Sequence, residues 1–208
     1  MLDIENYQMG TLVMKAKAPE SVVNTLYNEA KEELYSYNHK LAGHLKSQFL
    51  FNDKTKEWFY PEMQMYWDCY REQQCYFQGK ENIKLNYKAI DLWVNFMKPG
   101  DFNPIHTHGG DISFVLFLDV PEELKKEQDK HEAVSSVPGA LDFQFSQPLP
   151  PESRWFVNNH TIIPKTGDIL IFPAMLQHYV LPFKSDITRV SVSGNLKLDR
   201  TDLPKDYF

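Results

Sequence analysis

The spacing of hydrophobic residues changes its period near the middle of the chain. After Pro19, apolar residues recur every three or four positions, which is typical of a helix with one buried face. They are Val22, Val23, Leu26, Ala30 and Leu34. A second helix is predicted over residues 61–77, and the stretch between the helices fits either a strand or an extended connection. The first half of the chain is therefore predicted to be mainly helical.

Short runs rich in β-branched and aromatic residues begin near Ile90 and alternate with turns. The runs are IDLWVNFM, PIHTH, ISFVLFLDV, ALDFQF, RWFVNN, HTIIPK, GDILIFP, HYVLPF and TRVSVSGNLKL. This spacing predicts an antiparallel sandwich or small barrel, and hence an α+β fold with its helices first. The charged segment 121–139 is predicted to be a solvated loop or insertion that could cover the barrel mouth.

The length of 208 residues suits one domain, with residues 1–89 as a helical support region and residues 90–198 as the β core. The formal charge of −6 without a long basic run argues against strong binding to a nucleic acid backbone. No apolar stretch is long enough to cross a bilayer, and the first residues lack the pattern of a signal peptide. We therefore expect a cytoplasmic protein without a membrane partner.

Three histidines in the β-rich half are candidates for a metal site. His106 and His108 are two residues apart in PIHTH, so strand alternation should place both imidazoles on one face. His178 follows the run GDILIFP after a short turn, where an antiparallel strand can return beside an earlier one. With Asp111 close behind, these residues suit a divalent transition metal.

The last predicted strand has one polar face and one apolar face. Arg189, Ser191, Ser193 and Asn195 alternate with apolar residues along TRVSVSGNLKL. Two interpretations are open. The polar face is either the solvent side of a half-exposed strand or the lining of the barrel interior, where Arg189 would offer a fork of donors to a carboxylate.

Three blocks of the sequence, in order, resemble the core of the iron(II)/2-oxoglutarate oxygenases. They are GDFNPIHTHGGDISFVLFLDVP, GDILIFPAMLQHYV and TRVSVSGNL, and the likeness is greatest to a branch found in bacteriophages and marine bacteria. The resemblance implies a double-stranded β-helix, also called a jelly roll and cupin-like, with helices packed against it. It also implies ferrous iron, O2 and 2-oxoglutarate as co-substrate, and the host cytoplasm if a phage encodes the chain.

The resemblance also assigns roles to residues of the β-rich half. His106 and His178 correspond to the first and distal iron ligands, and Arg189 with Ser191 to the residues that grip the far carboxylate of 2-oxoglutarate. We expect further polar contacts from Asn195 and Asn95. The implied reaction is oxidative decarboxylation of 2-oxoglutarate coupled to oxidation of a substrate, usually its hydroxylation.

The chain departs from the family pattern at the middle metal ligand, where His108 replaces the usual carboxylate. Either His108 is the ligand, giving a three-histidine site, or Asp111 supplies the carboxylate from the turn after it. We favour His108, because strand alternation fixes its direction whereas Asp111 depends on loop conformation. Three neutral histidines would leave both charges of the metal uncancelled, so that an anionic co-substrate is held more tightly.

Two other functions remain open from the sequence. A cupin-type dioxygenase or isomerase could use the same three histidines without 2-oxoglutarate, but it would not need Arg189. A jelly roll acting as a non-catalytic binding module would tolerate loss of the histidines. The primary substrate cannot be read from the sequence, because the same fold and site chemistry serve many substrates.

Overall fold

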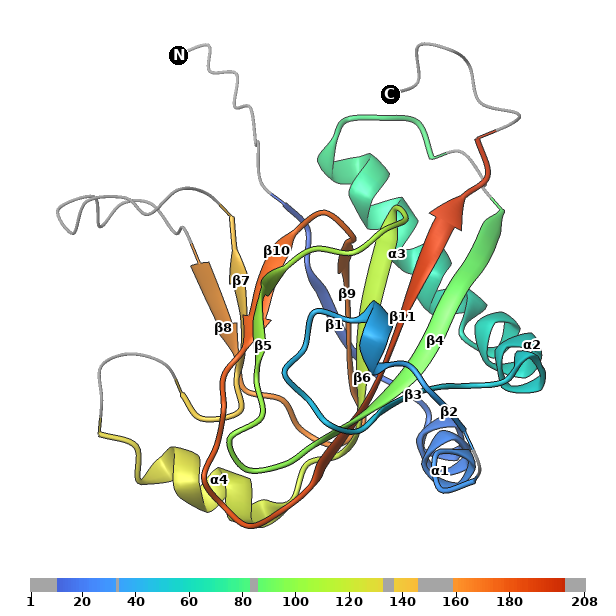
Figure 1. Cartoon of the computed structure of the whole chain (residues 1–208). Helices are drawn as coiled ribbons and strands as arrows, with labels where there is room; N and C mark the ends of the chain where they lie inside the picture. The colour runs from blue at the N-terminus through green and yellow to red at the C-terminus, as the bar shows by residue number, and fades with distance from the viewer. Residues whose placement is uncertain (1–10, 33, 83–85, 133–136, 146–158, 201–208) are drawn as a thin grey trace, which may run out of the picture.

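Two antiparallel sheets form the framework of the protein, as a computed structural model shows (Figure 1). The structure describes residues 11–32, 34–82, 86–132, 137–145 and 159–200. The larger sheet has seven strands in the order β1-β9-β6-β11-β4-β3-β2, and the smaller has four in the order β5-β10-β7-β8. Together with the helices, these sheets confirm the predicted α+β class.

The strands of the larger sheet are β1 (Met14–Lys17), β2 (Tyr35–Ser36), β3 (Gln48–Leu50), β4 (Tyr87–Met97), β6 (Ile112–Asp119), β9 (Asp168–Pro173) and β11 (Arg189–Leu198). The smaller sheet contains β5 (Asn103–His106), β7 (Leu141–Gln144), β8 (Asn159–Ile162) and β10 (Gln177–Val180). The helices are α1 (Glu20–Glu29), α2 (Asp53–Glu62), α3 (Gln64–Phe77) and α4 (Glu122–Asp129), with a short 3-10 turn, η1 (Asn38–Lys40). None of the helices in the described part is long and apolar enough to cross a membrane.

Helices α1, α2 and α3 cover one face of the larger sheet (Figure 1). Aromatic residues make this contact: the ring of Trp67 on α3 lies 5.0 Å, between centroids, from Phe114 on β6. From β11, Val190 and Val192 face this same core. Because successive strand residues alternate faces, the polar residues of β11 must point the other way, between the sheets.

The stretch between the two predicted helices contains a helix that the sequence pattern did not reveal. After β3, the side chain of Asn52 accepts a hydrogen bond from the backbone N–H of Thr55 at 2.9 Å and so caps the start of α2. This helix buries only Thr55, Phe59 and Tyr60, too few residues to give a clear period. Pro61, the predicted start of the second helix, lies within the last turn of α2, and α3 begins at Gln64.

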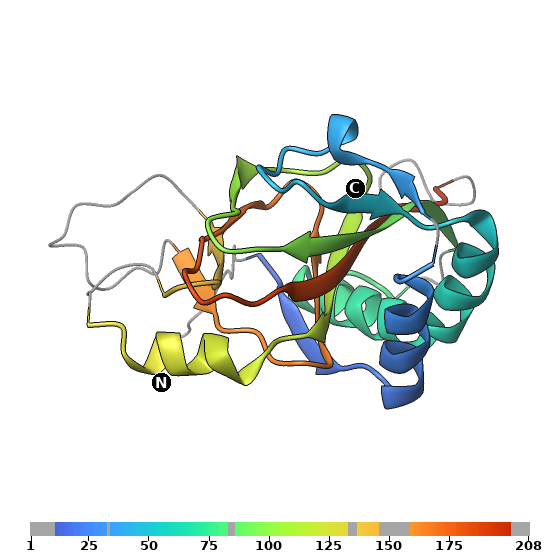
Figure 2. The ribbon, with the colours of Figure 1, turned by 60° about the horizontal axis from the view of Figure 1, so that its bottom comes forward.

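The charged segment 121–139 is not simply a solvated loop, and that prediction was wrong for residues 122–129. They form α4, whose only buried residue is Leu124. A single inward apolar residue leaves almost no hydrophobic pattern to read from the sequence. A turned view places α4 and η1 at opposite edges of the molecule (Figure 2). Most of the predicted strand RWFVNN lies outside the described residues.

Candidate active site

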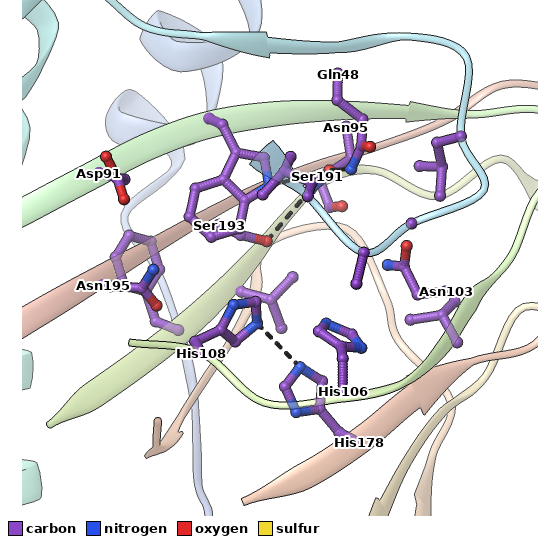
Figure 3. Close-up of a pocket in the computed structure, with 18 of the residues that line it drawn as sticks. Gln48, Asp91, Asn95, Asn103, His106, His108, His178, Ser191, Ser193 and Asn195 are labelled. Carbon is purple, nitrogen blue, oxygen red and sulfur yellow. Dashed lines mark hydrogen bonds between the residues drawn. The ribbon is translucent and has the colours of Figure 1, made fainter. Parts of the chain in front are cut away.

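Three histidine side chains meet between the two sheets (Figure 3). His106 on β5 and His178 on β10 are paired residues of neighbouring antiparallel strands. Each histidine offers one ring nitrogen such that all three nitrogens lie within 4.8 Å of one another. The Nε2 atoms of His108 and His178 are 3.2 Å apart. The structure therefore brings together the three histidines that the sequence singled out.

His108 reaches this cluster by a different route from the one predicted. Strand β5 ends at His106, so strand alternation does not set the direction of His108. Instead, the backbone N–H of His108 donates to the carbonyl of Ala174 at 2.8 Å, in the turn just before β10. This bond ties the end of β5 to the strand that carries His178.

The outer ring nitrogens of two histidines are fixed by backbone carbonyls. The Nδ1 atom of His106 lies 2.7 Å from the carbonyl oxygen of Pro104, and that of His178 lies 2.8 Å from the carbonyl oxygen of Leu176. A carbonyl oxygen only accepts hydrogen bonds, so each Nδ1 carries the proton and each Nε2 keeps a free lone pair. In metal sites, a hydrogen bond to the ring nitrogen that does not bind the metal commonly orients a histidine ligand in this way.

The surroundings of the three histidines favour their neutral, ligating form. Burial, with repulsion from His178 and His106, lowers the pKa of His108 to about 3. Burial and the nearby His106 lower the pKa of His178 to about 4. The pKa of His106 is also lowered, chiefly by burial. At neutral pH the cluster is therefore a set of three uncharged nitrogen donors, which fits a divalent transition metal.

Asp111 lies apart from the three histidines. Its carboxylate accepts a hydrogen bond from the backbone N–H of Leu198 at 2.8 Å and pairs with the guanidinium of Arg200. It thus joins the start of β6 to the end of β11. Among the described residues, the group that converges on a possible metal position contains histidines alone.

Arg189 is a buried cation that lines the same cavity as the histidines. Its Nη1 donates to the carbonyl of Gly139 at 2.6 Å, while its Nε has no hydrogen-bond partner among the described residues. No carboxylate in the described part of the chain pairs with it. Burial lowers its pKa to about 10, so it remains charged at neutral pH. A buried, unpaired charge of this kind calls for an anionic ligand.

The cavity that joins these groups has a volume of about 270 Å³. Ser191 and Asn195 on β11 and Asn95 on β4 line it, and all three are buried. The polar row of β11 thus faces the interior, and the solvent-facing interpretation was wrong. The predicted polar contacts and the three histidines share one chamber.

Asn95 sits at the centre of a hydrogen-bond network in the cavity wall. Its Oδ1 accepts from Gln48 Nε2 at 2.8 Å and from Trp93 Nε1 at 3.1 Å, and its amide nitrogen donates to Ser193 Oγ at 3.3 Å. Trp93 and Asp91 also line the cavity but were missed from the sequence. The period of two along β4 could have revealed them, since they share a face with Asn95.

The comparison with protein families identifies the chain. A sequence model of the family described as "Putative 2OG-Fe(II) oxygenase" matches residues 91–195, about half of the chain. The chain belongs to this family. It is therefore an oxidoreductase that uses iron(II), 2-oxoglutarate and O2, and the alternatives of a cupin-type enzyme without 2-oxoglutarate and of a binding module are set aside.

Solved structures of similar proteins confirm the double-stranded β-helix fold. A Pseudomonas putida prolyl-4-hydroxylase matches with a TM-score of 0.56 and 17% identity, over 90% of this chain and 92% of its own. The viral collagen prolyl hydroxylase of Paramecium Bursaria Chlorella virus-1 matches with a TM-score of 0.51 and 18% identity, over 88% of this chain and 94% of its own. The epimerase SnoN from nogalamycin biosynthesis matches with a TM-score of 0.56 and 14% identity, over 95% of this chain and 88% of its own. A comparison with curated protein sequences gave no match.

Proposed function

We propose that this 2OG-Fe(II) oxygenase holds iron with His106, His108 and His178 and oxidises a substrate C–H bond, most simply by hydroxylation. Arg189 binds the far carboxylate of 2-oxoglutarate, and Ser191 adds a hydroxyl donor. One observation carries the proposal: a buried arginine that has no anionic partner among the described residues lines the cavity in which three neutral histidines converge.

The residues of the site divide the work between them. Iron and 2-oxoglutarate supply the oxidising chemistry when bound, coupling decarboxylation of the co-substrate to oxidation of the substrate by O2. The backbone carbonyls of Pro104 and Leu176 keep the Nε2 atoms of two histidines pointing inward. The contact between Arg189 and Gly139 fixes the guanidinium, which would hold one carboxylate of the co-substrate in the cavity that the three histidines share.

Among the described residues, no carboxylate converges with the three histidines, and this affects how anions bind. Three neutral imidazoles cancel none of the charge of a divalent metal, and Arg189 adds a further positive charge to the same cavity. A dicarboxylate such as 2-oxoglutarate complements both positions at once. We expect the site to favour it over monocarboxylates more strongly than a site with a carboxylate ligand would.

The proposal is tested by anaerobic titration of the ferrous protein with 2-oxoglutarate. The measured quantity is the visible metal-to-ligand charge-transfer band of bound co-substrate, in the wild type, in Arg189→Ala and in Arg200→Ala. Loss of one partner of a buried charge pair should weaken binding on the order of a hundredfold in Arg189→Ala. Arg200 is a half-exposed arginine outside the cavity, so its variant should titrate as the wild type does.

The possible results distinguish between the binding of 2-oxoglutarate, the role of Arg189 and the three-histidine metal site. If iron binds but no band appears in the wild type, the cavity does not take 2-oxoglutarate in the proposed way. If the band appears and Arg189→Ala titrates like the wild type, another group anchors the co-substrate. Failure of the wild type to bind iron would contradict the three-histidine site itself.

A further inference from the structure

The cavity has two chemically different ends. The polar row of β11 runs from Arg189 to Asn195, a length of about 20 Å at the usual rise per strand residue. Asn195 is paired with Asp91 on β4, whereas Ser191 is paired with Asn95. One end of the cavity therefore carries the arginine proposed to anchor 2-oxoglutarate, and the other carries an aspartate.

The aspartate end adjoins the histidine cluster through an aromatic wall. The ring of Trp93 lies 5.7 Å, between centroids, from the ring of His108 and 6.2 Å from that of Tyr37. Burial raises the pKa of Tyr37 to about 12, helped by the charge of Asp91 and by a hydrogen bond to its carboxylate. Asp91 and Asn195 lie on the same side of the cavity as His108 (Figure 3).

Asp91 is the only carboxylate among the described residues that line the cavity. It is half-buried, and no lysine or arginine in the described part of the chain forms an ion pair with it. Lys40, the one lysine among the described residues that line the cavity, is exposed. A half-buried carboxylate without a countercharge is a ready partner for a cationic ligand.

A buried acceptor without a hydrogen-bond partner among the described residues also lines the cavity. The indole N–H of Trp93 can only donate, so the atom of Asn95 that it contacts must be the amide oxygen. Gln48 must then present its nitrogen to that oxygen, which leaves Gln48 Oε1 buried without a hydrogen-bond partner among the described residues. The cavity thus offers two acceptors, the carboxylate of Asp91 and Gln48 Oε1, which suit a ligand rich in donors.

We propose that the primary substrate carries an amine or guanidinium group that Asp91 binds, against the faces of Trp93 and Tyr37. Aromatic faces attract such cations in addition to the carboxylate. The cation would be held at the aspartate end, which places the rest of the substrate beside His108 and the metal position. This inference rests on the proposed function, because it takes the arginine end to be filled by 2-oxoglutarate.

The test uses pairs of amino acids that differ mainly in charge, L-arginine with L-citrulline and L-lysine with L-norleucine. Each is titrated anaerobically into protein loaded with iron(II) and 2-oxoglutarate, and the change in the charge-transfer band gives its dissociation constant. We expect the cationic member of at least one pair to bind roughly tenfold more tightly, as a charge-assisted hydrogen bond would give. Asp91→Asn should abolish that preference, while Asp91→Glu should retain part of it.

Controls keep this inference separate from the proposed function. Asp129→Asn removes an exposed carboxylate at the end of α4 and should keep the full preference of the wild type. If the wild type shows no charge-transfer band with 2-oxoglutarate, the proposed function is refuted. An intact band with no preference for cations in the wild type would overturn the role of Asp91 alone. A preference for cations that survives in Asp91→Asn would also overturn the role of Asp91. If Asp91→Asn does not fold, the role of Asp91 is judged from the wild type and Asp91→Glu.

Discussion

His106 and His178 are directly opposite each other on two antiparallel strands, with ring centroids 4.3 Å apart. They lie 72 positions apart in the sequence, and the pairing of β5 with β10 brings them together. Since the sheet itself sets this distance, the metal site is assembled when the smaller sheet folds. Metal binding should in turn stabilise the pairing of the two strands.

Removing either paired histidine should therefore abolish tight metal binding. We expect His178→Ala to weaken the affinity for iron(II) at least about hundredfold. Removing a residue that only hydrogen-bonds to a metal ligand already weakens metal affinity by about 10- to 100-fold, and removing the ligand itself should weaken it more. His160→Ala, at an exposed position on β8, is the matched control and should bind as the wild type does. Calorimetric titration under anaerobic conditions measures both. An unchanged affinity in His178→Ala would mean that the metal binds elsewhere.

The second ligand can be identified by comparing His108→Ala with Asp111→Ala. The carboxylate of Asp111 is engaged by Leu198 and Arg200, so its loss should cost about 1 kcal/mol of stability and leave iron affinity within about twofold. His108→Ala should lose most of the affinity. Metal content after dialysis and the free energy of unfolding are the two measurements. The reverse order of affinities would show that Asp111 turns inward when the metal binds.

Gly139 connects α4 to the proposed anchor of 2-oxoglutarate. Its φ of +67° is unfavourable for other residues, its carbonyl accepts from Arg189, and an added Cβ would lie 3.0 Å from Leu124. We expect Gly139→Ala to cost about 1–3 kcal/mol and to raise the dissociation constant of 2-oxoglutarate several-fold.

The matched control for this prediction is Gly79→Ala. Gly79 has a similar φ of +62° but nothing within 4 Å of an added Cβ. Its variant should show similar backbone strain and an unchanged affinity for 2-oxoglutarate. Equal effects of the two variants on co-substrate binding would contradict the link between Gly139 and Arg189.

The sequence predicted the β-rich half well, because its strands are short runs of β-branched and aromatic residues between turns, and its histidines and arginine fall in recognisable blocks. It missed α2 and α4, since helices with few inward apolar residues leave little pattern. It could not show that Arg189 has no anionic partner among the described residues or that Gln48 enters the cavity wall, because both depend on contacts between distant segments. The cytoplasmic location, the single domain with its 1–89 and 90–198 parts and the lack of a nucleic acid partner stay predictions.

The stability of the larger sheet should depend on pH through Asp168 on β9. This residue is 2% exposed and pairs with Lys15 at 2.8 Å and Lys17 at 2.7 Å on β1. Burial acts to raise its pKa, but the bonds from these lysines and from the backbone of Lys165 outweigh it, and the pKa is lowered. A lowered pKa means that the folded state binds the proton less readily than the unfolded state.

The stabilisation from Asp168 is therefore complete above about pH 4 and is lost as the pH falls through the lowered pKa. We expect Asp168→Asn to reduce the free energy of unfolding by about 1–3 kcal/mol at pH 7, since the two lysines left behind can be solvated. The difference from the wild type should shrink steadily below about pH 4. Denaturant unfolding at several pH values measures it, with Asp129→Asn as the exposed control. A difference that stays constant between about pH 3 and pH 7 would mean that Asp168 contributes through its shape and hydrogen bonds rather than through its charge.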